Sequence, residues 1–189
     1  MFNYIIAITI ITLTLLIAIS VIATSLYNGI PPMPTSPKVK TKLLRVLPPL
    51  EKGNIFEIGS GWGTLAFSLA KHFPMCSVHA YENSFFPYLF STHCNKLKSL
   101  NNLYFHYQNF FFVSLKEADL IVCYLYPSAM KKLKKKLDNE LSANCRILSH
   151  TFAIPGWKAE HIYEVNDLYH TKIYLYHFNT ANPNLHLLA

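Results

Sequence analysis

The stretch Glu57-Ile58-Gly59-Ser60-Gly61-Trp62-Gly63 decides the fold of this 189-residue chain. It follows the apolar segment Asn54-Ile55-Phe56 and precedes residues 64–71, which favour a helix. Glycines let the backbone approach a ligand closely, and the N-terminus of a helix offers backbone N–H groups that lack intrahelical partners. The order of strand, glycine-rich turn and helix therefore predicts a corner that holds a nucleotide-like ligand.

Acidic residues on either side of this turn narrow the class of ligand. Glu82 closes the next apolar run, 19 residues after Gly63, and an acid in that place accepts hydrogen bonds from ribose hydroxyls. The glycine spacing is G-x-G-x-G, whereas dinucleotide-binding enzymes have G-x-G-x-x-G. Because Glu57 stands two residues before the first glycine, the motif resembles motif I of the class I methyltransferases, which use S-adenosylmethionine (SAM).

The resemblance implies how the cofactor is held at the carboxyl ends of the parallel strands, where ligands of open α/β sheets bind. Glu57 is expected to hold the methionine part of SAM, and the backbone of Gly59–Gly63 to line it. Glu82 is expected to bind the ribose. Asn109 stands where many SAM enzymes place an acid or an amide against the adenine.

The N-terminal segment predicts a membrane anchor. Residues 1–37 carry no charged side chain, and Tyr4–Leu26 is almost entirely apolar; about 20 such residues span a bilayer as a helix. A cleavable signal peptide is the alternative, but no Lys or Arg precedes the run, which is also long for a signal peptide. Basic residues follow the run at positions 38, 40, 42 and 45. The positive-inside rule therefore places the domain in the cytoplasm of a single-pass membrane protein.

Charge and cysteine content agree with a cytoplasmic domain near a membrane. The formal net charge is +7, and Lys131–Lys136 alone contains five lysines, which favours contact with anionic headgroups. Alternatively, these lysines form the solvated face of a helix that buries Met130, Leu133, Leu137 and Leu141. The four cysteines show no CxxC pairing, which is typical of reduced core thiols. The nine histidines show no metal-site spacing, so we expect no metal.

The order of elements predicts the fold class. We expect an anchor at 1–29, a proline-rich linker at 30–37, a domain at 38–180 and a tail at 181–189. Strands are predicted at 54–58, 76–81, 103–107, 119–125 and 145–152, and helices at 37–47, 62–72, 84–98 and 127–141. This alternation indicates an α/β, Rossmann-like parallel sheet covered on both faces.

The C-terminal part predicts an antiparallel hairpin. Residues 160–166 and 171–178 are the two expected strands, and residues 154–159 leave little room for a helix before them. The expected fold is thus a trimmed version of the seven-stranded class I methyltransferase sheet, preceded by one transmembrane helix.

Tyr124 and Tyr126 are the candidate catalytic residues. Only about one part in a thousand of an ordinary lysine is neutral at pH 7.4, so a lysine acceptor needs an apolar wall that favours the neutral amine. The two tyrosines, at the end of the fourth strand, are expected to form that wall, although a chain with 12 tyrosines places some there by chance. The segment Tyr124–Pro127 lacks the Asn/Asp-Pro-Pro-aromatic motif of enzymes that methylate nucleobases. We therefore expect no nucleic-acid partner.

Three further features have structural as well as functional interpretations. Phe110–Phe112 can stack on the adenine or pack in the core. His150 is the histidine nearest the expected pocket, and a core role is the alternative. Asp119 is expected to have a structural role, because it opens the fourth strand about 17 Å from Tyr124, at the wrong end of the sheet.

Several segments together resemble one subgroup of methyltransferases. They are the N-terminal apolar run, Pro31–Ser36, Glu57–Gly61, Tyr81-Glu82, Met130–Leu141 and Phe152–Trp157. They resemble the small membrane-associated lysine methyltransferases related to the mitochondrial ATP synthase c-subunit enzyme. The resemblance implies that Thr35 and Ser36 contact the cofactor and that the acceptor is a lysine of a membrane protein. The chain departs from the relatives at Gly61-Trp62-Gly63-Thr64, where they have Gly-Asp-Gly-Arg.

We therefore expect a membrane-anchored, SAM-dependent protein-lysine N-methyltransferase. One alternative is a methyltransferase of a lipid-like or small-molecule acceptor, and another is a non-catalytic SAM-binding membrane scaffold. The expected cofactor-binding residues are Thr35, Ser36, Glu57, Gly59, Ser60, Gly61, Gly63, Glu82, Asn83 and Asn109.

Overall fold

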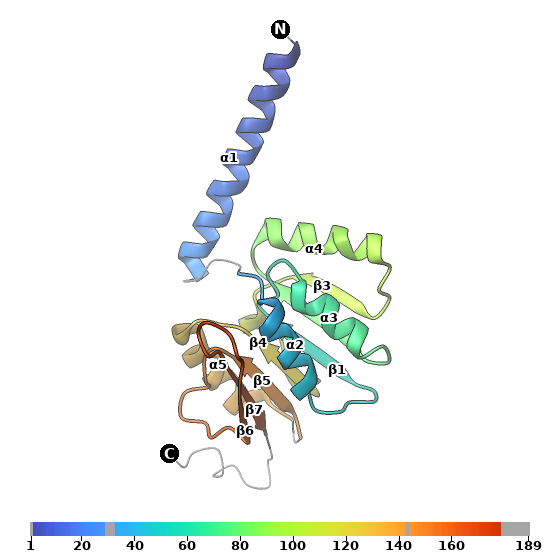
Figure 1. The fold of residues 1–189 in the computed structure, drawn as a ribbon, viewed down its shortest axis with the longest axis vertical. Coiled ribbons are helices and arrows are strands. Elements are labelled where there is room, and N and C mark those ends of the chain that lie inside the picture. The colour runs from blue at the N-terminus through green and yellow to red at the C-terminus, as the bar shows by residue number, and fades with distance from the viewer. Residues whose placement is uncertain (1, 29–32, 143, 179–189) are drawn as a thin grey trace.

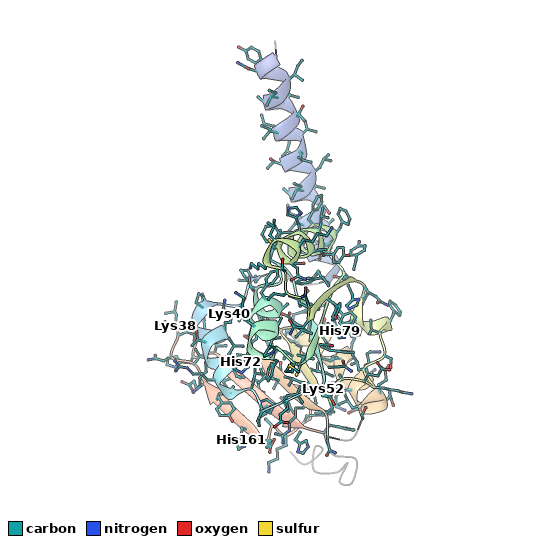
Figure 2. The ribbon with its side chains drawn as sticks, turned by 90° about the vertical axis from the view of Figure 1, so that its right-hand side faces the viewer. Lys38, Lys40, Lys52, His72, His79 and His161 are labelled. Carbon is teal, nitrogen blue, oxygen red and sulfur yellow. The ribbon has the colours of Figure 1, made fainter. Side chains whose placement is uncertain are left out.

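The structure is a computed structural model that describes residues 2–28, 33–142 and 144–178 (Figure 1). Part of the predicted linker and the whole predicted tail lie outside the described residues. The elements are α1 (Phe2–Asn28), α2 (Pro37–Val46), β1 (Asn54–Ile58), α3 (Thr64–His72), β2 (Ser77–Glu82), α4 (Phe85–Lys98), β3 (Leu103–Tyr107), the 3₁₀ helix η1 (Phe110–Phe112), β4 (Leu120–Cys123), α5 (Pro127–Glu140), β5 (Arg146–His150), β6 (His161–Glu164) and β7 (Lys172–His177).

One sheet organises the domain. Its strand order is β3-β2-β1-β4-β5-β7-β6. The first five strands in sequence run parallel to one another, and β7 is antiparallel to both β5 and β6. This arrangement confirms the predicted α/β class and the terminal hairpin. Strand order reverses between β1 and β4, and ligands of open α/β sheets bind beside such a switch point.

Side chains of the central strands point alternately to the two faces of the sheet, and each face has its own hydrophobic core. Leu120 and Val122 of β4 pack in the core that α2 and α3 cover, whereas Ile121 and Cys123 pack in the core that α5 covers. Successive side chains of a strand point to opposite faces, so one strand supplies both cores. For the same reason all four residues of β4 are apolar and buried.

Two strands end earlier than predicted, and the reasons are local. We expected 119–125 for β4, but the chain leaves the sheet after Cys123, because Pro127 already begins α5. We expected 145–152 for β5, but Thr151 takes a φ of 72° and thereby ends the strand at His150. Between β5 and β6 the described chain holds no helix, as predicted. Ile154 and Trp157 of this segment fill the core beside α5 instead.

Several side chains have the structural roles that the sequence predicts. Asp119 accepts a hydrogen bond from the backbone N–H of Asn54 through Oδ2 at 2.8 Å, so it joins the starts of β1 and β4. The lysines of α5 lie outside a buried stripe of Ala129, Met130, Leu133 and Leu137. All four cysteines are free thiols.

The N-terminal helix α1 stands away from the sheet (Figure 1). Its residues Asn3–Leu26 are long and apolar enough to cross a membrane, and none of this span is buried inside the protein. Signal sequences share these properties of length and composition.

The Asn102 side chain ties the loops at the amino end of the sheet together. Its amide nitrogen donates to the backbone carbonyls of Ala70, Phe73 and Cys76 at 3.0, 3.0 and 3.1 Å. Asn102→Ala leaves these carbonyls without that donor, and we expect it to lower the free energy of unfolding by about 2 kcal/mol. Urea unfolding of the full chain in detergent micelles measures this change. The neighbouring exposed Asn101 provides the control, since Asn101→Ala should change stability little; equal losses in both variants would refute the role.

Candidate functional site

The ends of three parallel strands lie side by side in register. Ile58 of β1 pairs with Cys123 of β4, and Cys123 pairs with Ser149 of β5. The next residues along these strands, Gly59, Tyr124 and His150, therefore form a neighbouring row at the carboxyl edge of the sheet. Sequence analysis placed the site at this edge, and the register brings its parts together there.

The glycine-rich turn is held by hydrogen bonds to the end of β2. The N–H groups of Gly59 and Ser60 both donate to the Tyr81 carbonyl at 3.0 Å. The Glu82 carboxylate then accepts from two backbone groups: Oε2 from the N–H of Gly61 at 2.7 Å and Oε1 from the N–H of Ser84 at 2.8 Å. Glu82 thus fixes the turn and the chain entering α4 in one arrangement.

Two glycines of the turn are required by their geometry. Gly63 has a φ of 75°, and a Cβ there would lie 2.8 Å from the Phe105 ring and 3.0 Å from Ser91. Gly59 has a φ of 77°, and its Cβ would lie 3.0 Å from Leu125. Any other residue would strain the backbone and meet packed atoms. The contact with Leu125 also shows that the turn adjoins the segment that follows β4.

Glu57, near the end of β1, and Ser60, in the turn, are buried, and each has a side-chain oxygen without a hydrogen-bond partner. Their side chains are 4% and 6% exposed, and neither Glu57 Oε2 nor Ser60 Oγ has a hydrogen-bond partner among the described residues. Burial raises the pKa of the Glu57 carboxyl well above its ordinary value, and the nearby Glu82 carboxylate raises it further. The backbone N–H of Ala66 hydrogen-bonds the carboxyl and partly offsets this rise, but a buried carboxylate oxygen without a partner is costly, so Oε2 is suited to a ligand that brings positive charge and hydrogen-bond donors.

Tyr124 and His150 form a stacked pair beside the turn. Their ring centroids are 4.2 Å apart with an interplanar angle of 25°. His150 Nε2 lies 3.3 Å from the Thr35 hydroxyl and Nδ1 lies 3.2 Å from the Thr151 hydroxyl. Burial lowers the pKa of His150 to about 4, so the imidazole is neutral at physiological pH. The pair joins the segment before α2 to the carboxyl ends of β4 and β5.

Some predicted site residues have structural partners of their own. Ser36 caps α2, because its Oγ accepts from the N–H of Val39 at 3.3 Å. Asn109 caps η1, because its Oδ1 accepts from the N–H of Phe111 at 3.0 Å. Asn83 directly follows Glu82 and is half-buried. These contacts leave the predicted cofactor roles of the three residues untested.

The aromatic residues near the site divide into packed and exposed ones. Phe110 and Phe111 pack against the core around α5, as does Tyr126, whereas Phe112 is exposed. Tyr126 therefore packs in that core, while Tyr124 stacks on His150. Trp62, which stands where relatives were expected to have an acid, packs edge-on against Phe90 of α4 with ring centroids 5.5 Å apart.

Sequence analysis missed the contact between Thr35 and His150, and it missed that Glu82 shapes the turn. The first contact joins residues 115 positions apart, and no local pattern encodes it. The second had a signal, since an acid at the end of β2 stands opposite the exposed N–H groups of a glycine-rich turn.

Comparison with known proteins identifies the domain that carries this site. Residues 57–161 match the family model of the ANTKMT methyltransferase domain. The chain belongs to this family. A protein-lysine N-methyltransferase of Saccharolobus islandicus (strain REY15A) is 28% identical over 152 residues, which cover 78% of this chain and 92% of the relative.

Solved structures show the same fold as this ANTKMT-family chain. An RNA methyltransferase of Salinibacter ruber, in complex with S-adenosyl-L-homocysteine, has a TM-score of 0.70 and 22% identity, with 78% of this chain and 95% of that one covered. A precorrin-6y C5,15-methyltransferase of Geobacter metallireducens GS-15 has a TM-score of 0.63 and 13% identity, with 78% and 90% covered. The family match and these folds identify the chain as a SAM-dependent methyltransferase.

The residues at the carboxyl edge of the sheet fit this cofactor. SAM carries a positively charged amino group and sulfonium, and the buried Glu57 carboxylate, whose Oε2 has no partner among the described residues, offers the opposite charge. The unpaired hydroxyl of Ser60 can donate to a carboxylate. Across the described ranges, no three His, Cys, Asp or Glu side chains gather as a metal site would require.

Glu57→Gln tests whether the buried carboxylate is kept for the cofactor. We expect affinity for SAM to fall at least about tenfold, because the cation loses its counter-charge. Without ligand, the raised folded-state pKa means that Glu57 costs stability as pH rises through that pKa, whereas below the unfolded value the cost is absent. The variant should therefore be more stable than wild type at pH 8 and equally stable near pH 4.

Calorimetric titration with SAM and urea unfolding of the full chain in detergent measure the two effects. Glu51→Gln, at an exposed position before β1, serves as the control. Unchanged affinity in Glu57→Gln would remove Glu57 from the cofactor site.

His150→Phe tests the burial of a neutral imidazole against Tyr124. With a folded-state pKa of about 4 against an ordinary 6.5, wild type should lose up to about 3 kcal/mol of stability as pH falls from 6.5 to 4. Phenylalanine keeps the stack but does not titrate, so the variant should lose less stability over this window. Urea unfolding at pH 4.5 and 7.5 compares the two proteins. His161→Phe, at an exposed position on β6, should behave as wild type; the same acid sensitivity in His150→Phe would contradict the buried neutral state.

Proposed function

We propose that the chain is a membrane-anchored protein-lysine N-methyltransferase that uses SAM. The match to the ANTKMT methyltransferase domain and the relative named protein-lysine N-methyltransferase support a lysine acceptor. The apolar span Asn3–Leu26 supports the anchor, and the basic residues that follow it support a cytoplasmic catalytic domain.

The contact between Thr35 and His150 limits the distance between the end of the anchor and the site. Thr35 stands seven residues after Asn28, the last residue of α1, and seven residues reach at most about 25 Å. Since Thr35 lies 3.3 Å from His150, the site is within that reach of the end of the anchor. A substrate lysine close to the membrane surface is therefore favoured over one in the distant cytosol.

The cofactor-binding roles follow from the unused groups of the glycine-rich turn. We assign the Glu57 carboxylate to the methionine amino group and the Ser60 hydroxyl to its carboxylate. Glu82 accepts one backbone N–H at each oxygen, and each oxygen has a second lone pair with which to accept from a ribose hydroxyl. Thr35, Ser36, Asn83 and Asn109 remain predicted contacts.

The step that depends most on the protein is preparation of the acceptor amine. Bound SAM supplies a methyl group that is already activated, so alignment of the incoming lone pair contributes much of the rate. The lysine must first lose its proton, and an apolar wall lowers its pKa. We assign that wall to Tyr124, which is held by its stack on His150.

Tyr126 has a different place in this proposal. Its packing against the core around α5 makes it a support for the segment after β4. Tyr124 is thus the stronger candidate of the two for contact with the substrate.

Methyl transfer to membrane fractions tests the proposed function. With radiolabelled SAM, the full chain in detergent should label a membrane protein, and acid hydrolysis should recover the label as methyllysine. Tyr124→Ala removes the apolar wall, and we expect turnover to fall at least about tenfold while SAM affinity is retained. The loss of turnover in Tyr124→Ala relative to wild type should be smaller at pH 9, where more of the lysine is neutral in water.

The control is Tyr104→Ala, an exposed tyrosine near the amino end of β3, which should retain full turnover. Radiolabel in the lipid fraction would show that the acceptor is lipid-like and not a protein lysine. SAM binding without label in any fraction would favour the non-catalytic scaffold.

A further inference from the structure

Helix α4 exposes four large apolar side chains that an ordinary surface helix would bury. Such a helix normally buries its apolar stripe and exposes its polar one. In α4 the buried residues are Pro87 and Ser91. The outer face, defined here as Phe85, Leu89, Phe90 and Leu97, is 46%, 49%, 52% and 75% exposed. These four residues lie on one side of the helix at 3.6 residues per turn.

The position of α4 relates this outer face to the anchor. Both views show α4 at the end of the domain from which α1 rises, and Figure 1 shows it lying crosswise to α1. Residues of α1 contact residues of α4. Among residues 3–26, whose exposure the structure describes, the partly buried ones lie in the C-terminal half of α1, and they are Ile17, Ser20, Val21, Thr24 and Ser25.

Helix dimensions give the depth at which α4 meets the anchor. At 1.5 Å per residue, the 24 residues of Asn3–Leu26 form a helix about 36 Å long. The hydrocarbon core of a bilayer is about 30 Å thick. The span therefore exceeds the hydrocarbon core by about 6 Å, so the last turn of α1, which holds the partly buried Thr24 and Ser25, extends into the headgroup region. A helix crosswise to α1 at this depth lies in the plane of the membrane surface.

The charge of α4 agrees with that location. The helix contains no Asp or Glu, and its last turn carries the exposed Lys96, while the Lys98 ammonium lies 3.9 Å from the centroid of the Phe67 ring. Helices that lie in the membrane interface combine an apolar, aromatic face with basic residues that contact anionic headgroups. Trp62, packed against Phe90, adds a residue type that is enriched at the membrane–water interface.

We propose that the outer face of α4 lies in a phospholipid surface and is a second membrane contact beside α1. The inference rests on the proposed anchor, because α1 sets the orientation of the membrane. Two membrane contacts restrict the orientation of the domain more than one contact would. Since α4 follows Glu82 after two residues, this contact also holds the glycine-rich turn and the site against the membrane surface.

Spin labels on the full chain in vesicles test this contact directly. In a Cys94→Ser background, whose other cysteines are buried, single labels are placed by Leu89→Cys and Leu97→Cys. Vesicles contain phosphatidylcholine and phosphatidylglycerol. Power saturation then measures collisions with oxygen, which concentrates in lipid, and with a water-soluble nickel chelate. SAM titration of each labelled protein verifies that the fold is retained.

Two further labels provide references within the same chain. Leu13→Cys, in the middle of α1, reports whether the anchor is in the bilayer. Met75→Cys, an exposed site between α3 and β2 at the amino end of the sheet, reports an aqueous position. We expect the ratio of oxygen to nickel collisions at Leu89 and Leu97 to shift from the Met75 value toward the Leu13 value.

Each other outcome overturns the inference in a recognisable way. If Leu13 is in lipid while Leu89 and Leu97 match Met75, the anchor stands and the α4 contact fails. If Leu13 and the α4 labels all match Met75, the anchor fails as well. If the α4 labels broaden one another as the protein-to-lipid ratio rises, a second copy of the chain covers this face instead.

Discussion

The two hydrogen bonds accepted by the Glu82 carboxylate are the interaction on which the site depends. One oxygen accepts from Gly61 and the other from Ser84, so a single buried side chain fixes the glycine-rich turn and the start of α4. Hydrogen bonds from neutral donors to a charged acceptor are among the stronger ones in proteins. The same carboxylate therefore shapes the glycine-rich turn and positions the helix whose outer face is apolar.

A consequence of this design is an excess of negative charge beneath the turn. Glu57 and Glu82 are both buried, and the repulsion between them contributes to the raised pKa of Glu57. A cationic cofactor offsets this repulsion, whereas a neutral or anionic ligand would not. The electrostatics of the two buried carboxyl groups thus favour a cationic ligand, which agrees with the proposed binding of SAM at this turn.

Local pattern was enough to predict the parallel sheet, but not how distant parts meet. The bounds of β1 and β3 agree with the prediction, because short apolar runs between turn residues define them. The end of β5 was wrong by two residues, since a left-handed Thr151 leaves no signature in a β-branched sequence. The stack of Tyr124 on His150 and the contact of Thr35 depend on strand register and on the path of the linker, which no short window contains.

The sequence pattern predicted helix α4 but not which of its faces is buried. Periodicity predicts a helix over 84–98, and α4 spans Phe85–Lys98, but the period does not say which face turns inward. Here the buried residues of the helix are the small Pro87 and Ser91, and a Cβ at Gly63 would already lie 3.0 Å from the Ser91 Cβ. Larger apolar side chains cannot fit in that contact, so they are displaced to the outside. Close packing of the glycine-rich turn against α4 is therefore the physical reason that an apolar surface adjoins the site.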